Sequence, residues 1–215
     1  MPLGIRNCRK QCLIAGFLIL SSTLASHAAL ADISNRSTGV VGQSIPTNQE
    51  AKAESDQRFL TLFRAAPLSL TQAIAVAEAL HAGSRAVAVA FDASGIPGYR
   101  VRTVKNSDIW ENVVDVTTGR TIGLETSLSM SDLEVDERDN IMQLKSVGQE
   151  LSDAVAIAEK AAAGKAIGGG LVKGQDQVNF LVVVLSDDHV KEVYLDPPHG
   201  ASKNEQTISR KNDGH

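Results

Sequence analysis

The residues best suited to chemistry gather near the end of the chain, where acidic residues and histidines lie close together. Asp187, Asp188 and His189 belong to the run SDDH, and Asp196 and His199 follow shortly after it. Carboxylate and imidazole groups at this spacing could bind a hard metal ion. However, the run stands between two β-branched segments, where polar turn residues are expected in any case. We therefore predict a turn here, with no metal site and no cofactor.

A second pattern that could bind a ligand is the stretch AAAGKAIGGG, residues 161–170, which contains Lys165. A phosphate-binding loop places its glycines before a helix, so that backbone N–H groups at the helix N-terminus point at the anion. Here the glycines follow an alanine-rich segment of helical spacing, and no Ser or Thr follows the lysine. The pattern therefore predicts the end of a helix at Gly164 rather than a nucleotide site.

The last candidates for catalysis are Asp115 and Asp196, which stand at equivalent places just before predicted turns. A pair of carboxylates can perform general acid–base chemistry. A carboxylate before a turn can also accept hydrogen bonds from the backbone N–H groups of that turn. No hydroxyl and histidine partners accompany these aspartates, so we predict turn residues and expect that the protein is not an enzyme.

An internal repeat positions these candidates. Residues 70–119 align with residues 151–200 at a constant offset of 81 without a gap, and 11 of the 50 pairs are identical. The agreement extends beyond the alanine-rich part into the β-branched part, so chance matching of alanines does not explain it. We infer that the chain holds two copies of one unit.

Each unit begins with a segment of helical spacing and continues with β-branched runs, which in the first unit are residues 86–91, 99–104 and 109–116. The pattern predicts an α+β fold with two repeats, each one helix packed on a three-stranded antiparallel β-meander. Structural roles in caps and turns are expected for Thr71, Gly83, Asp115, Gly119, Ser152, Gly164, Asp196 and Gly200. The two glycines that follow the helices, Gly83 and Gly164, are expected to adopt positive φ angles.

The second strand differs between the units. In YRVRTV, residues 99–104, Arg100 and Arg102 alternate with less polar residues, which predicts one solvent-exposed face. In FLVVVL, residues 180–185, nothing alternates, which predicts cover on both faces by the first unit, by residues 49–64 or by a partner. Trp110 lies on the third strand beside a turn, where an exposed aromatic residue would be a natural contact residue.

The N-terminus carries Arg6, Arg9 and Lys10, then the apolar run 13–20, then small residues that end at Ala31. This order is typical of a secretory signal peptide, and we expect cleavage after Ala31. The alternative is an uncleaved membrane anchor. The cleaved chain would hold 18 Lys and Arg against 25 Asp and Glu and no cysteine. Because it is acidic and has no basic stripe, we expect neither nucleic-acid binding nor stable membrane insertion.

The predicted organisation has six segments. They are a signal peptide (1–31), a linker with a short helix (32–66), repeat 1 (67–122), an interrepeat segment (123–149), repeat 2 (150–200) and a disordered tail (201–215). In the linker, Phe59, Leu62 and Phe63 share one face of the short helix. The acidic interrepeat segment has helical spacing and a candidate cap that links Ser131 with Glu134.

The helix, the short meander and the closing aspartate-to-glycine turn resemble the PepSY domain family, found in propeptides of secreted metallopeptidases and in bacterial envelope proteins. The residues that carry the resemblance are Leu70, Ala73, Ile74, Ala77, Val114, Asp115, Thr118 and Gly119 in the first copy. In the second copy they are Leu151, Ala154, Val155, Ala158, Leu195, Asp196, His199 and Gly200. Pro197 and Pro198 depart from the pattern and put a regular hairpin after Asp196 in doubt.

The resemblance implies a non-catalytic periplasmic or secreted module that binds or inhibits a peptidase or another envelope protein. It transfers no catalytic residue. Our own candidates for partner contact are Trp110, Arg100 and Arg102. The alternative is an envelope sensor, or a protein that binds a small ligand or metal in a pocket between the repeats.

Overall fold

The computed structural model describes residues 4–7, 48–174 and 178–197. These residues form one antiparallel sheet of eight strands in the order β1-β8-β7-β6-β2-β3-β4-β5. The four α-helices are α1 (Asn48–Ala65), α2 (Leu70–Leu80), α3 (Val135–Gln143) and α4 (Leu151–Ala162). The strands are β1 (Gly4–Asn7), β2 (Arg85–Asp92), β3 (Gly98–Lys105), β4 (Asp108–Asp115), β5 (Thr121–Leu128), β6 (Lys165–Lys173), β7 (Val178–Ser186) and β8 (His189–Leu195).

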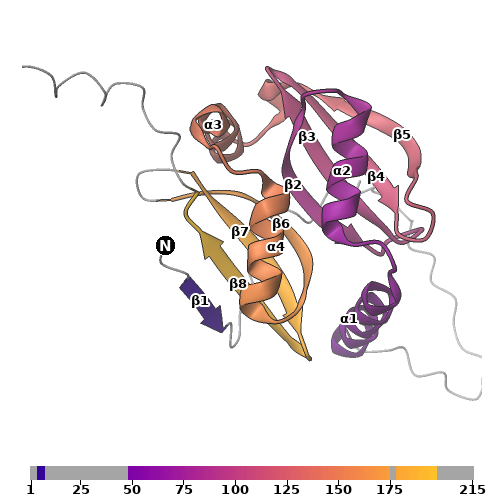
Figure 1. Cartoon of the computed structure of the whole chain (residues 1–215). Coiled ribbons are helices and arrows are strands. Elements are labelled where there is room, and N and C mark those ends of the chain that lie inside the picture. Colours follow the sequence, from indigo (N-terminus) through magenta and orange to yellow (C-terminus); the bar gives the residue numbers. More distant parts are fainter. Residues whose placement is uncertain (1–3, 8–47, 175–177, 198–215) are drawn as a thin grey trace, which may run out of the picture.

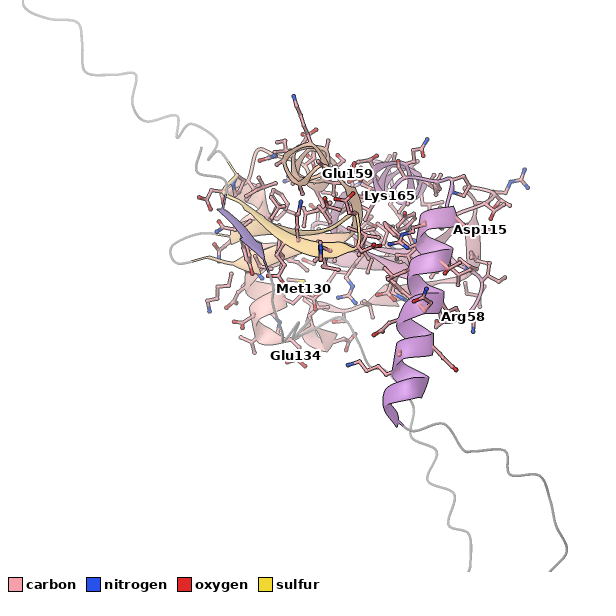
Figure 2. All side chains as sticks on the ribbon, turned by 90° about the horizontal axis from the view of Figure 1, so that it is seen from below. Arg58, Asp115, Met130, Glu134, Glu159 and Lys165 are labelled. Carbon is pink, nitrogen blue, oxygen red and sulfur yellow. The ribbon has the colours of Figure 1, made fainter. Side chains whose placement is uncertain are left out.

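The order of one helix followed by three strands occurs twice, as α2-β2-β3-β4 and as α4-β6-β7-β8. The two halves are joined into one sheet because β2 and β6 pair with each other. Helices α2 and α4 lie on the same face of the sheet (Figure 1). The segment around Met130 and Glu134 lies on the opposite face (Figure 2). The fold is therefore α+β, and the pairing of β2 with β6 joins the two sets of strands edge to edge.

Helices α2 and α4 bury residues at the same spacing. Leu70 and Ile74 in α2, like Leu151 and Val155 in α4, are less than 2% exposed and join one continuous core. Residues at positions i and i+4 share one face of a helix, so this face packs on the sheet. Full burial of each large aliphatic side chain contributes about 1.5–3 kcal/mol.

The helix caps differ from the prediction. The N-cap of α2 is Ser69, which forms a capping box with Gln72, and Thr71 lies inside the helix. The N-cap of α4 is Glu150, whose side chain makes no capping hydrogen bond, and Ser152 lies inside the helix. Ser69 forms the cap because it is the residue with extended backbone, and a capping side chain bonds to N–H groups two or three residues further on.

The two glycines after the helices have different roles. Gly83 has a φ of +81°, as predicted. Gly164 does not have a positive φ, and the left-handed residue at the end of α4 is Ala163, with a φ of +52°. Gly164 is needed for another reason: a Cβ atom there would overlap with the carbonyl group of Leu185 on β7. The connection from helix to strand is two residues shorter in the second half, with residues 163–164 in place of residues 81–84.

The glycine run Gly168–Gly170 lies at the junction of the two halves. These residues pair with Ala88–Ala90 of β2 on one side and with β7 on the other. A Cβ at Gly168 would lie 2.9 Å from the carbonyl oxygen of Val89. The strand continues through this run, with a bulge between Ala166 and Gly168. Residues without a side chain fit between the closely placed backbones of β2 and β7 at this junction.

The first meander has four strands rather than the predicted three. Strand β5 falls inside the segment that we expected to be an acidic connection, and it pairs with β4 along an edge of the sheet. The predicted cap from Ser131 to Glu134 is also wrong. Ser129 and Asp132 form the capping box of a short 3-10 helix, and α3 follows with Glu134 at its N-cap.

The second strands of the two halves show the same alternation of burial. In β3, Tyr99 and Val101 are fully buried, whereas Arg100 is partly exposed, as predicted. In β7, however, Leu181 and Val183 are partly exposed, so neither the first unit nor residues 49–64 fully cover this face, and cover by a partner stays a prediction. The outer face of β7 therefore presents an apolar strip that the described helices leave partly open.

Helix α1 packs at the lower end of the sheet in Figure 1. Phe63 is buried and Phe59 is partly buried, and both rings make edge-to-face contacts with Phe91. Lys165 donates a hydrogen bond from Nζ to the carbonyl oxygen of Ala66 at 2.6 Å. In the described ranges, no single helix has the length and apolar character to cross a membrane, whereas the bent pair 52–65 and 70–80 passes by length and composition.

Candidate functional site

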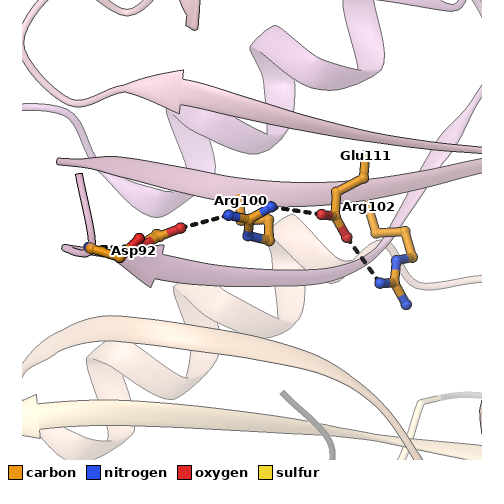
Figure 3. Close-up of polar contacts among 5 residues, drawn as sticks. Asp92, Arg100, Arg102 and Glu111 are labelled. Atoms are coloured by element: carbon orange, nitrogen blue, oxygen red, sulfur yellow. Dashed lines mark hydrogen bonds and ion pairs between the residues drawn. The ribbon is translucent and has the colours of Figure 1, made fainter. Parts of the chain in front are cut away.

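The two candidate arginines lie in a row of ion pairs on the face of the sheet opposite α2 and α4. Arg100 bonds to Asp92 at 2.6 Å and to Glu111 at 2.7 Å (Figure 3). Arg102 bonds to the second oxygen of Glu111 at 2.8 Å and to Glu137 of α3. The row crosses from β2 through β3 and β4 and then reaches α3.

The charges of this row stabilise one another. Burial raises the pKa of Glu111, but the hydrogen bonds from Arg100 and Arg102 outweigh it and hold that pKa below its usual range. The pKa of Asp92 is also lowered, because bonds from Ser94 and Arg100 outweigh the effect of burial. Both carboxylates are thus ionised partners of the arginines at neutral pH, and neither is poised as a general acid.

The third candidate, Trp110, belongs to a different cluster. Its ring stacks on His81 with centroids 3.8 Å apart and planes 8° from parallel. Glu125 accepts hydrogen bonds from His81 at 2.8 Å and from Asn112 at 2.7 Å. The cluster joins the end of α2 to β4 and to the bulge of β5, where Gly123 has a φ of +73°.

The structure does not bring the three candidate contact residues together. Trp110 stands opposite Thr103 in the register, on the face of the sheet that α2 covers, whereas Arg100 and Arg102 stand on the opposite face. Arg102 is also only 17% exposed. A single partner surface built from all three residues is therefore excluded, and each cluster has to be considered separately.

Asp115 has the predicted position in a turn. Its Oδ1 accepts backbone hydrogen bonds from Thr117 at 2.7 Å and from Thr118 at 3.3 Å, and Gly119 adopts a φ of +66°. These bonds hold the pKa of Asp115 below its usual value, with the bond from Thr117 as the largest cause. Asp196 is exposed and follows the end of β8. Gly200 lies outside the described residues.

Two helix carboxylates are structural acceptors. Oε1 of Glu78 accepts a hydrogen bond from the backbone N–H of Ala86 at 2.7 Å. Oε1 of Glu159 accepts the corresponding bond from Ala166 at 2.8 Å. Each bond fastens the first strand of its half to the preceding helix. Burial raises the pKa of Glu78 despite that bond. Glu78 and Glu159 are identical residues at the offset of 81, and this match could have indicated that the two carboxylates share one role.

The acidic residues and the histidine of the run SDDH lie around the β7–β8 turn. Asp187 has a φ of +54°, Asp188 pairs with Arg64 of α1, and His189 is exposed. His199 is outside the described residues. Within the described ranges, no three His, Cys, Asp or Glu residues are grouped so that they could hold a metal ion.

Lys165 is a structural residue in this arrangement. Burial lowers its pKa, and a coulombic effect of Glu159 opposes that shift. Its Nζ lies 5.0 Å from the centre of the Phe63 ring and bonds to the carbonyl oxygens that end α1. A cation at this position complements the negative end of a helix dipole. Figure 2 shows Lys165 on the same side of the sheet as Glu159.

With this geometry in place, the chain can be compared with known proteins. Residues 67–125 match the PepSY family, described as the peptidase propeptide and YPEB domain. The match contains α2, β2, β3, β4 and part of β5, and it confirms the resemblance for the first half. It does not extend to α4, β6, β7 and β8. A second tandem copy therefore remains a prediction from the internal alignment.

The other comparisons are more distant. A crystal structure of a "putative lipoprotein" from Clostridium difficile 630 aligns with 63% of this chain and 90% of its own, at 18% sequence identity and a TM-score of 0.37. No curated protein matches the chain.

Proposed function

We propose that this chain is an exported, non-catalytic binding module whose partner is a peptidase or another envelope protein. The single observation that carries the proposal is the match of residues 67–125 to a family described by peptidase propeptides. A propeptide acts by contact with its peptidase, so the inherited function is recognition rather than chemistry.

The roles of the polar residues support the same conclusion. Glu78 and Glu159 accept strand N–H groups, Asp115 accepts turn N–H groups, and Glu111 pairs with two arginines. Each of these groups already has a structural partner, whereas a catalytic group has to remain available to a substrate. The proposal therefore assigns these residues to the fold and leaves recognition to the surface.

Within the matching segment, Trp110 is our candidate for the main contact residue. Its ring is held by His81 and is only partly buried, and it stands next to the exposed strand β5. A held aromatic ring has little conformational entropy to lose on binding, and tryptophan is over-represented among residues that dominate interfaces.

Export is part of the proposal. The basic residues, the apolar run and the small residues up to Ala31 are typical of a signal peptide, and the peptidase propeptide family fits an extracytoplasmic site. Mass spectrometry of the protein recovered from the periplasm or the medium should give an N-terminus at Asp32. A protein that keeps residues 1–31 and stays in the membrane fraction would contradict this part.

The test of function uses the chain that begins at Asp32. It should bind at least one exported protein in an envelope extract or change the activity of a secreted peptidase. The variant Trp110→Ala should weaken the binding at least about tenfold, as expected for a central contact. Gln143→Ala, at the exposed end of α3 and away from both Trp110 and β8, is the matched control and should bind like the natural chain. If neither binding nor a change of peptidase activity is found, the proposal fails.

The alternative, a small-ligand protein or sensor with a pocket between the repeats, has less support. The halves meet through the direct pairing of Ala88–Ala90 with Gly168–Gly170, and added side-chain atoms at Gly168 would clash there. A ligand specific for the folded state raises the melting temperature. A thermal-shift screen with divalent metals and small metabolites would favour this alternative if one compound stabilised the chain.

A further inference from the structure

One half of the sheet contains a strand that the other half lacks in its own sequence. In the first half, β5 pairs antiparallel with β4 and covers its edge from Ile109 to Val114. In the second half, the corresponding last strand is β8. Among the described residues, no strand that follows β8 covers its edge.

The edge of β8 is instead paired with a segment from the start of the chain. Strand β1 runs antiparallel to β8, with Gly4 opposite Tyr194 and Asn7 opposite Lys191. At the offset of 81, Lys191 and Tyr194 correspond to Trp110 and Val113 of β4. These two residues lie within the stretch of β4 that β5 covers. The extended segment 4–7 thus occupies on β8 the place that β5 occupies on β4.

The two outer edges of the sheet differ in their ability to accept a further strand. β5 has a bulge between its pairs with Glu111 and Val113, and Gly123 there adopts a positive φ. Bulges twist an edge away from pairing, and proteins use them to prevent strand addition. The pairing of β7 with β8 has no register shift from Phe180 to Ser186. The edge of β8 is therefore the regular one.

The surroundings of β8 also indicate the chemistry of the segment that it accepts. Tyr194 and Glu192 stand opposite Leu181 and Val183, the partly exposed apolar residues of the outer face. A strand on β8 would extend this apolar strip. Glu192 supplies a carboxylate, and Arg6 occupies the opposite position in the register. A basic residue at this position of an incoming strand would complement Glu192.

We propose that the edge of β8 is the binding site for an extended partner segment with a basic residue opposite Glu192. In the uncleaved chain, Gly4–Asn7 occupies this edge, and removal of residues 1–31 opens it. This inference rests on the proposed function and adds to it a second contact surface of the exported chain, apart from Trp110 on β4 near the other end of the sheet. Strand addition at a sheet edge supplies backbone hydrogen bonds, and the flanking side chains supply specificity.

The experiment measures amide hydrogen exchange of residues 191–194 in four proteins. They are the full chain, its Ile5→Pro variant, its Arg6→Glu variant and the chain from Asp32, which keeps every element from α1 to β8. The outward amides of β8 should exchange about tenfold faster in Ile5→Pro and in the shorter chain, because they lose their backbone partners. Arg6→Glu should give a smaller increase. Amides of β5 should exchange equally in all four.

A peptide then tests binding in trans to the chain from Asp32. The probe is PLGIRNSR, which is residues 2–9 with Cys8→Ser, and the controls carry Ile5→Pro or Arg6→Glu. The probe should slow exchange in β8 only, and both controls should do so less. The inference is overturned if the full chain and its Ile5→Pro variant exchange alike, or if the probe protects β5 or no strand.

These outcomes separate this inference from the proposed function. If an envelope partner binds and protects a surface other than β8, the proposed function stands and the β8 site is wrong. If the probe protects β8 but no envelope partner or peptidase effect is found, the strand-accepting edge stands and the proposed function is wrong.

Discussion

The substitution Gly164→Ala should destabilise this protein strongly, although the backbone of Gly164 is not in the left-handed region. The new methyl group would overlap with the carbonyl oxygen of Leu185 and lie 2.8 Å from its carbonyl carbon. It would also lie 2.8 Å from a methyl group of Val184. Because the obstacle is mainly the backbone of a central strand, no side-chain rotation can relieve it.

The expected loss of stability follows from a comparison of Gly164 with its counterpart Gly83 in the first half and with the adjacent Ala163. Overpacking in a core costs typically 1–3 kcal/mol, and since backbone must move here, we expect a loss of about 3 kcal/mol or more. Gly83→Ala has no close contact, so it should lose only the left-handed penalty of about 1–2 kcal/mol. Ala163→Gly relieves a φ of +52° and should be neutral or stabilising by up to about 1 kcal/mol.

The assay is urea unfolding of the chain from Asp32, followed by the emission of Trp110 and by circular dichroism. A loss of about 3 kcal/mol corresponds to a decrease in Tm of roughly 6–12 °C for a protein of this size. An unchanged m value would show that the native fold is retained. The reasoning is refuted if Gly164→Ala is less destabilising than Gly83→Ala, or if Ala163→Gly is clearly destabilising.

Three further predictions concern single side chains. Burial raises the pKa of Glu78, so the ionised carboxylate lowers the stability of the folded chain at neutral pH. Glu78→Gln keeps an oxygen acceptor for the N–H of Ala86. The variant should therefore unfold at a higher urea concentration than the natural chain at pH 7, but not below about pH 4. The pKa of Asp115 is lowered, so its carboxylate stabilises the fold above the unfolded-state pKa, and this stabilisation is lost as pH falls through the folded-state pKa. Asp115→Ala should therefore unfold at a lower urea concentration than the natural chain at neutral pH, and this difference should become smaller in acid. His81→Ala removes the ring that stacks on Trp110 and should shift the emission of Trp110; an unchanged spectrum would contradict the stacked geometry.

The sequence predicts the helices and most strands of this fold because their burial follows simple periods. Leu70 and Ile74 share a helix face, and Tyr99 and Val101 alternate with arginines along a strand. Strand β5 was missed for a physical reason. As an edge strand it buries little, and it contains Gly123 and Glu125, so neither its composition nor its alternation distinguishes it from a polar connection.

The candidate site was harder to predict because it depends on registers and on faces. Arg100 and Trp110 lie on neighbouring strands but on opposite faces of the sheet. A shift of the register between β3 and β4 by one residue would place them on the same face, and the sequence does not specify that register. The roles of Glu78 and Glu159 could not be predicted, because the strand N–H groups that they bind come eight and seven residues later, after a turn whose length the helical period does not specify. The row of ion pairs required the contact between β3 and α3, which are distant in sequence.

A difference between the two halves explains why one edge of the sheet is suited to a partner. If both halves derive from one unit, the first has gained a covering strand with a bulge, which satisfies β4 and blunts the edge. The second continues from β8 into Pro197, which can neither donate a backbone hydrogen bond nor extend a regular hairpin. The edge of β4 is thus satisfied by the strand that follows it, whereas the edge of β8 is satisfied only by β1 from the start of the chain. Loss of residues 1–31 would leave that regular edge open, which is the condition that recognition by strand addition requires.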